Sequence, residues 1–173
     1  ASKSIAELSD DQAESTTLGN AVYVLDAATG GVLWSASNSR SHVRSSVTLD
    51  LVVDQMDHAI PSSPTVLDLN QDGVLDVIFS IDISGQVFRF DFNLNSPATT
   101  LSVSGARIAD LHESGVQRRF YNPLDGVVLP PTADGAKART ALVTGSGYRA
   151  NPLTAEGFPN RFYVIYDPNL RLP

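Results

Sequence analysis

The sequence contains no cysteine among its 173 residues. This absence excludes disulfides, thiolate zinc sites and cysteine nucleophiles, and it leaves the redox compartment open. Basic residues are also few, since 12 Lys and Arg stand against 19 Asp and Glu and give a formal net charge of −7. Nucleic acids and anionic membrane surfaces attract basic patches. The charge balance therefore argues against both as partners.

Long apolar runs are missing as well. No stretch approaches the roughly 20 apolar residues that a membrane-spanning helix needs. The N-terminus lacks the basic-then-apolar pattern of a signal peptide, so we expect either a mature chain or a piece cut from a longer one. The composition, 42% hydrophobic and 18% charged, is ordinary for a folded protein with one hydrophobic core.

A sustained helical period is the third absence. Short β-prone runs alternate instead with Gly, Pro, Asn and Asp, and this pattern predicts an all-β fold. The expected strands lie at residues 21–26, 32–35, 47–53, 65–67, 77–79, 87–92, 99–103, 107–111, 127–129, 139–144 and 161–167. Residues 1–19 are polar and acidic, and we expect a mobile arm or linker there.

A coarse recurrence refines the fold class. Residues 22–26, 87–91 and 163–167 each suggest an alternating strand that ends in Asp and is followed by a turn. Similar sheet units tens of residues apart are typical of β-propeller blades, which take about 40–45 residues each. Residues 20–173 are therefore expected to supply about four blades of a larger ring. The single tryptophan, Trp34, is expected to pack between neighbouring sheets.

One stretch, residues 68–76, concentrates oxygen ligands at every second position. The predicted metal ligands are the side chains of Asp68, Asn70, Asp72 and Asp76 and the backbone carbonyl of Val74. Three carboxylates so close together repel one another unless a cation lies among them. Gly73 allows the sharp turn that brings such oxygens around one point. We therefore predict a hard-cation site in this loop.

The loop opens like an EF-hand but differs from one in two respects. The twelfth position is Phe79 rather than Glu, and β-prone runs rather than helices flank the loop. The sequence thus predicts a calcium clip between two strands, in a calcium-rich setting outside the cytoplasm. Magnesium is less suited because it resists dense protein cages. The simpler alternative is an Asx-rich turn whose carboxylates are merely solvated.

Catalytic constellations are not evident. His42, His58 and His112 are scattered without metal or nucleophile spacing, and each is expected to be a surface or turn histidine. The Gly-Ser-Gly at residues 145–147 lacks the pattern of a nucleophile elbow and suggests a turn. We therefore expect no enzymatic activity.

Three further features have a structural and a functional interpretation. For the Arg118–Arg119 pair, pairing with nearby carboxylates is favoured over a partner-recognition patch. For Tyr148 and Arg149, packing is favoured over partner contact. Asp82 follows the loop closely enough to hydrogen-bond to its predicted ligands and orient them, although the spacing does not require this.

Several passages together resemble a known family. The segment GNAVYVLDAATGGVLW at residues 19–34 resembles the repeat of quinoprotein-type propellers, and residues 65–79 followed by GQVFRFD at 85–91 resemble a calcium-bearing blade. The set is completed by RRFY at residues 118–121, GSGYRANPL at 145–153 and RFYVIYD at 161–167. In this order, over about residues 19–168, they resemble the C-terminal propeller domain of the PilY family of type IV pilus biogenesis and tip-adhesin proteins.

That resemblance implies a modified β-propeller at the bacterial surface or pilus tip, secreted through the periplasm. It implies minor pilins and a host or abiotic surface as partners. In the family, calcium in a loop of this type influences the balance between pilus extension and retraction, and here that role would fall on the ligand set of residues 68–76. The family's propeller is longer than this chain, so the rest of the ring is expected to lie outside it.

Two other functions share parts of the pattern. Integrin-like propeller repeats carry the same D-x-N-x-D-G-x-x-D loop between strands, where calcium only stiffens an extracellular binding module. Quinone-cofactor dehydrogenases share the repeat at residues 19–34. Their chemistry needs a cofactor cavity and a catalytic carboxylate, whereas all the predicted calcium ligands here lie in one local loop.

Overall fold

The computed structural model describes residues 18–39, 50–94, 101–133, 135, 137–149, 152–153 and 158–170. Nearly all of the predicted arm at residues 1–19 lies outside these ranges. Within them, every regular element is a β-strand, and no helix is long and apolar enough to cross a membrane. The strands are β1 (Ala21–Leu25), β2 (Val32–Ser37), β3 (Leu51–Val52), β4 (Thr65–Leu67), β5 (Val77–Ile81), β6 (Gln86–Leu94), β7 (Leu101–Asp110), β8 (Asp125–Leu129), β9 (Arg139–Gly145) and β10 (Phe162–Asp167). The all-β prediction is confirmed.

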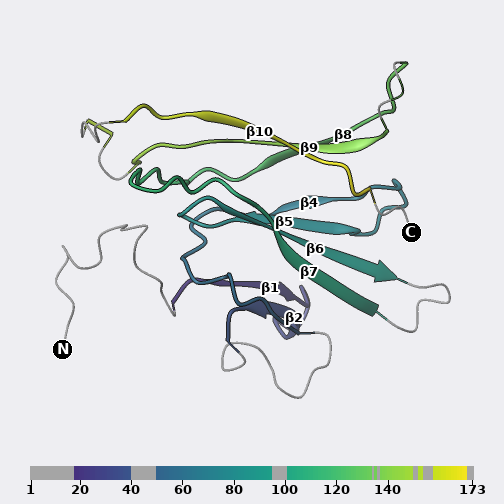
Figure 1. Ribbon diagram of the computed structural model, residues 1–173. Coiled ribbons are helices and arrows are strands. Elements are labelled where there is room, and N and C mark those ends of the chain that lie inside the picture. Colours follow the sequence, from purple (N-terminus) through teal and green to yellow (C-terminus); the bar gives the residue numbers. More distant parts are fainter. Residues whose placement is uncertain are drawn as a thin grey trace, which may run out of the picture.

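The strands form three open sheets, in the orders β1-β2-β3, β4-β5-β6-β7 and β10-β9-β8. All neighbouring strands are antiparallel except β2 and β3, which run parallel. The sheets lie as three layers, with the four-stranded sheet between the other two (Figure 1). The segment between β3 and β4 crosses from the first layer to the middle one and therefore borders both.

The central strands of the middle sheet are buried on both faces because another sheet covers each face, and successive side chains point to opposite faces. On β6, Phe88, Phe90 and Phe92 join the core shared with the first sheet. On the opposite face, side chains of β5 and β6 such as Phe79 and Val87 join the core shared with the third sheet. This double burial explains why all five residues of β5 are buried.

Trp34 packs as expected between sheets. Its side chain is fully buried on β2, and its ring meets Phe90 and Phe92 edge-on at centroid distances of 5.2 and 5.0 Å. Edge-to-face pairs of this kind add roughly 0.5–1.5 kcal/mol beyond the area they bury. These ring contacts therefore stabilise the packing of the first sheet against the middle sheet.

Two sequence predictions need correction. The runs at 99–103 and 107–111 were expected as separate strands, but β7 is continuous from Leu101 to Asp110 and pairs along β6. Asp91 was expected to end a strand, yet β6 continues through it to Leu94. Asp91 lies inside the strand and forms an ion pair with Arg89, whereas Asp26 directly follows β1 and Asp167 ends β10.

Candidate metal centre

The acidic loop joins β4 to β5, so its predicted position between two strands is observed. The loop closes where the Asp76 amide donates to the Leu67 carbonyl at 3.1 Å. The Asp76 carbonyl in turn accepts the Phe92 amide of β6 at 2.7 Å. The last residue of the loop is therefore tied to β4 and β6, the two strands that flank β5 in the middle sheet.

Asp68 is held by the backbone of the loop that follows it. Its Oδ1 accepts the amides of Gln71 and Asp72 at 2.6 and 3.2 Å, and its Oδ2 accepts the Gly73 amide at 2.8 Å. Gln71 and Gly73 have positive φ values of 62° and 86°, which let the backbone curl around the carboxylate. The loop thus directs three N–H groups at one carboxylate.

The other predicted ligands are oriented in the same way. Oδ1 of Asn70 accepts the Asp72 amide at 3.0 Å, and Oδ1 of Asp72 accepts the Val74 amide at 2.8 Å. Oδ2 of Asp76 accepts the Leu69 and Asn70 amides at 2.6 and 3.2 Å. Each carboxylate oxygen has two lone pairs. Those that accept a single N–H therefore keep one lone pair for a cation.

The charge of the loop favours a cation. Within the described part of the chain, none of the carboxylates of Asp68, Asp72 and Asp76 forms a salt bridge with Lys or Arg. The donor set consists of oxygen alone, as calcium prefers. The residues present therefore fit a calcium ion, and the ligation itself remains a prediction.

A tighter group of potential ligands lies elsewhere. Among the residues that the structure describes, Asp57, His58 and Asp82 form the group of three whose ligand atoms all lie within 4.8 Å of one another. The three loop carboxylates do not meet this spacing. The structure therefore brings Asp57, His58 and Asp82 closer together than the carboxylates of the predicted calcium loop.

Asp82 belongs to this second group, and its contacts do not support the hypothesis that it backs the calcium loop. It lies in the turn between β5 and β6, is fully buried, and accepts hydrogen bonds from Ser84 and Gln86. Burial raises the pKa of Asp82 above its usual value, while these hydrogen bonds and His58 oppose the rise. The group is not apparent from the sequence because His58 and Asp82 are 24 positions apart.

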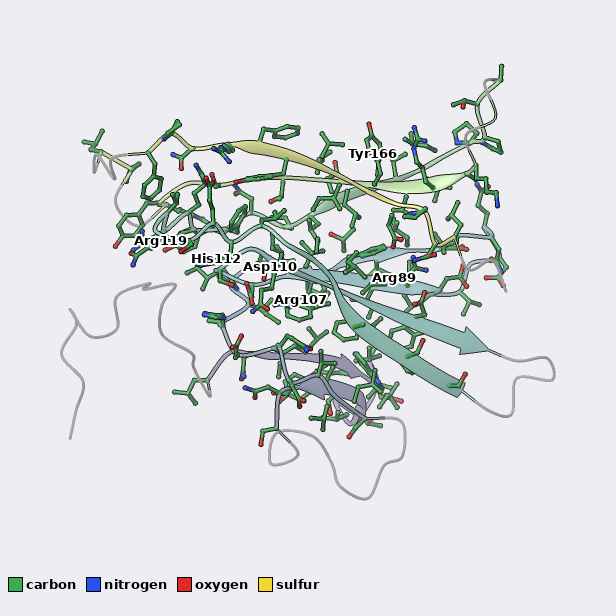
Figure 2. All side chains as sticks on the ribbon, in the orientation of Figure 1. Arg89, Arg107, Asp110, His112, Arg119 and Tyr166 are labelled. Carbon is green, nitrogen blue, oxygen red and sulfur yellow. The ribbon has the colours of Figure 1, made fainter. Side chains whose placement is uncertain are left out.

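The arginine pair takes mainly structural roles. Nη1 of Arg118 lies 2.5 Å from Oε2 of Glu113, as the carboxylate-pairing interpretation predicts. The guanidinium of Arg119 lies over the ring of Tyr148 at 4.0 Å from its centroid, which favours packing for Tyr148. His112 is exposed at the end of β7, close to Arg107 and Asp110 (Figure 2), whereas His42 lies outside the described residues.

Fold and site together define an all-β protein of stacked, mainly antiparallel sheets with an acidic loop between two strands. No protein family matches the sequence, and no curated protein matches it. Among solved structures, the chain is similar to the crystal structure of the Pseudomonas aeruginosa PilY1 C-terminal domain, with a TM-score of 0.58 and 19% sequence identity. The match covers 91% of this chain and 33% of that chain.

The match confirms, as a likeness of fold, the resemblance to PilY proteins drawn from the ordered motifs. This chain spans about a third of the length of the PilY1 chain that it matches. Almost all of the present chain therefore has a structural counterpart within the longer PilY1 chain.

Proposed function

We propose that this chain is a calcium-binding segment of a type IV pilus tip or biogenesis protein of the PilY family. The observation that carries the proposal is the fold likeness to the PilY1 C-terminal domain over 91% of the chain. The acidic loop of residues 68–76, with no cationic partner among the described residues, supports the calcium assignment. We place the protein at the bacterial cell surface or pilus tip.

The three sheets are proposed as blades of a modified β-propeller whose other blades belong to the rest of a longer protein. Exposed apolar side chains on the two outer sheets support this proposal. Tyr23 and Leu25 of β1 and Phe162, Val164 and Tyr166 of β10 are all about half exposed or more. A further blade on each side would remove these side chains from water, which is favourable by about 25 cal/mol per Å².

Calcium acts in this proposal by removing the repulsion among Asp68, Asp72 and Asp76. With that charge neutralised, the loop holds β4 and β5 together, and the hydrogen bond from Phe92 to Asp76 carries the constraint to β6. The surface around the loop becomes rigid enough to engage or release a partner. We propose that this change biases pilus extension against retraction and contributes to surface adhesion, without catalysis.

A pull-down of minor pilins with the immobilised chain tests the pilus assignment. We expect capture in calcium, reduced capture in chelator, and equally reduced capture by Asp72→Ala in calcium. A matched control is Asp125→Ala, an exposed carboxylate on β8 outside the loop. Calcium stabilisation without pilin capture in any condition would favour the integrin-like binding module and contradict the pilus role.

A further inference from the structure

The group of Asp57, His58 and Asp82 brings together ligands from two separate segments. Asp57 and His58 come from the connection between β3 and β4, and Asp82 comes from the turn between β5 and β6. The two segments are joined by a hydrogen bond from the Ile83 amide to the Ala59 carbonyl, 2.8 Å long. This backbone hydrogen bond holds the two segments next to each other and so keeps the three side chains close together.

The distances within the group match a small coordination sphere. Nδ1 of His58 lies 2.8 Å from Oδ1 of Asp57 and 3.9 Å from Oδ2 of Asp82. Ligands on a tetrahedral zinc ion with bonds of about 2.0–2.1 Å are about 3.3 Å apart. The observed separations fall on both sides of that value, so small shifts would place all three atoms around one ion.

The side-chain amide of Gln86 faces all three ligand residues and would have to move aside for such an ion. Its Nε2 is 2.9 Å from the Gln55 carbonyl, from Oδ1 of Asp57 and from Oδ2 of Asp82, and 3.2 Å from Nδ1 of His58. Nδ1 of His58 also lies 2.8 Å from Oδ1 of Asp57, where it donates or accepts according to its tautomer. Polar atoms of four groups therefore converge around the Gln86 amide, and a cation taking its place would be met by two carboxylates, an imidazole nitrogen and a carbonyl.

Space for an incoming ion is present next to the group. A cavity of about 390 Å³ is lined by Asp57, His58 and Gln86 and also by Arg107 and His112. Arg107 donates to Oε1 of Gln86 at 2.5 Å and to Asp110 at 3.1 Å, so Asp110 balances its charge. Two of the three ligand residues, Asp57 and His58, therefore line open space from which an ion and its waters can enter, whereas Asp82 is buried behind them.

We propose that Asp57, His58 and Asp82 form a binding site for a divalent transition-metal ion, with Zn²⁺ as the representative. An imidazole nitrogen with two carboxylates suits zinc and its first-row neighbours, whereas calcium takes oxygen ligands. The Gln86 amide moves towards the cavity when the ion enters. The site is separate from the acidic loop of residues 68–76, so the chain carries one place for a transition metal and another for calcium.

Titration of the full chain with Zn²⁺, followed by calorimetry and thermal melting, tests this site. We expect one Zn²⁺ per chain and a rise in Tm. His58→Ala and Asp57→Asn should each weaken binding at least about tenfold, the smallest loss usual even for residues that only support metal ligands. Asp57→Asn serves as the second variant if His58→Ala fails to fold, because the Asp57 side chain is 40% exposed and Asn has the same shape.

Two controls make the result specific. His112→Ala removes the other histidine of the cavity, and Asp72→Ala removes a carboxylate of the acidic loop; both variants should bind Zn²⁺ like the wild type. Absence of Zn²⁺ binding by the wild type would overturn the proposal. Binding that survives both His58→Ala and Asp57→Asn, or that falls equally in His112→Ala, would overturn it as well. Failure of the calcium response alone would leave the zinc result unaffected.

Discussion

Nη1 of Arg89 lies 2.6 Å from Oδ2 of Asp167, and both side chains are 5% exposed. This ion pair joins β6 of the middle sheet to β10 of the outer sheet (Figure 2 labels Arg89). Arg89 also contacts Asp91 at 2.5 Å and donates to the Asn169 carbonyl. Burial alone would lower the pKa of Arg89, but its hydrogen bonds to Asp91 and Asp167 outweigh burial and raise it.

Asp167→Ala should destabilise the fold strongly, because it leaves the buried charge of Arg89 with fewer partners. Loss of one member of a buried pair typically lowers the free energy of unfolding by about 3–5 kcal/mol. Arg161→Ala is a matched control, since its ion pair with Glu113 is about half exposed and should contribute much less. Urea denaturation of both variants checks the prediction, and equal losses would contradict it.

Gly105→Ala should destabilise the middle sheet by about 1–3 kcal/mol, as overpacking typically does. A Cβ at Gly105 would lie 2.4 Å from Cδ1 of Phe90, and that ring is fully buried. Gly145→Ala on β9 is the control, because a Cβ there meets its nearest atom, the Arg161 carbonyl oxygen, at 3.9 Å. Thermal melts should show a clear loss for Gly105→Ala alone. Similar Tm values for the two variants would contradict the prediction that the Phe90 ring requires glycine at position 105.

Glu113 should make a pH-dependent contribution to the free energy of unfolding. The hydrogen bond from Arg118 lowers the pKa of Glu113 below its model-compound value of 4.5, and the charge of Arg161 adds to this effect. A carboxylate with a lowered pKa stabilises the folded state above its unfolded pKa and loses this contribution as the pH falls through the folded pKa. The stability difference between wild type and Glu113→Gln should therefore shrink below about pH 4.5. A difference that grows on acidification would contradict the assignment.

Much of the fold could be predicted because the strands follow simple alternation and glycine turns. The continuity of β7 could not be predicted because Gly105 and Ala106 interrupt its apolar pattern. The interruption has a cause that only the packed structure reveals, since Phe90 on the neighbouring strand occupies the space of a side chain at position 105. The prediction that Asp91 ends a strand was also wrong. Asp91 forms an ion pair with Arg89 on the same strand, and the pattern of the sequence alone does not show this contact.

The acidic loop could be predicted as a candidate calcium site because its oxygen-bearing residues are close in sequence. The cluster of Asp57, His58 and Asp82 could not, because it depends on a contact between a loop and a distant turn. A histidine next to an aspartate is a common sequence, and nothing near residue 58 indicates the buried carboxylate of Asp82. Local spacing therefore predicts candidate sites within one loop, whereas clusters that depend on tertiary contacts are not apparent from the sequence.

The central claim is that residues 68–76 bind calcium, and a thermal melt of the chain in calcium, magnesium and chelator tests it most directly. The account predicts a calcium-selective rise in stability, about 2.7 kcal/mol at a free concentration one hundred times the dissociation constant. Asp72→Ala should abolish this rise, whereas Asp57→Asn should retain it. A chain that melts at the same temperature in all three conditions, or a calcium effect that survives Asp72→Ala, would contradict the account.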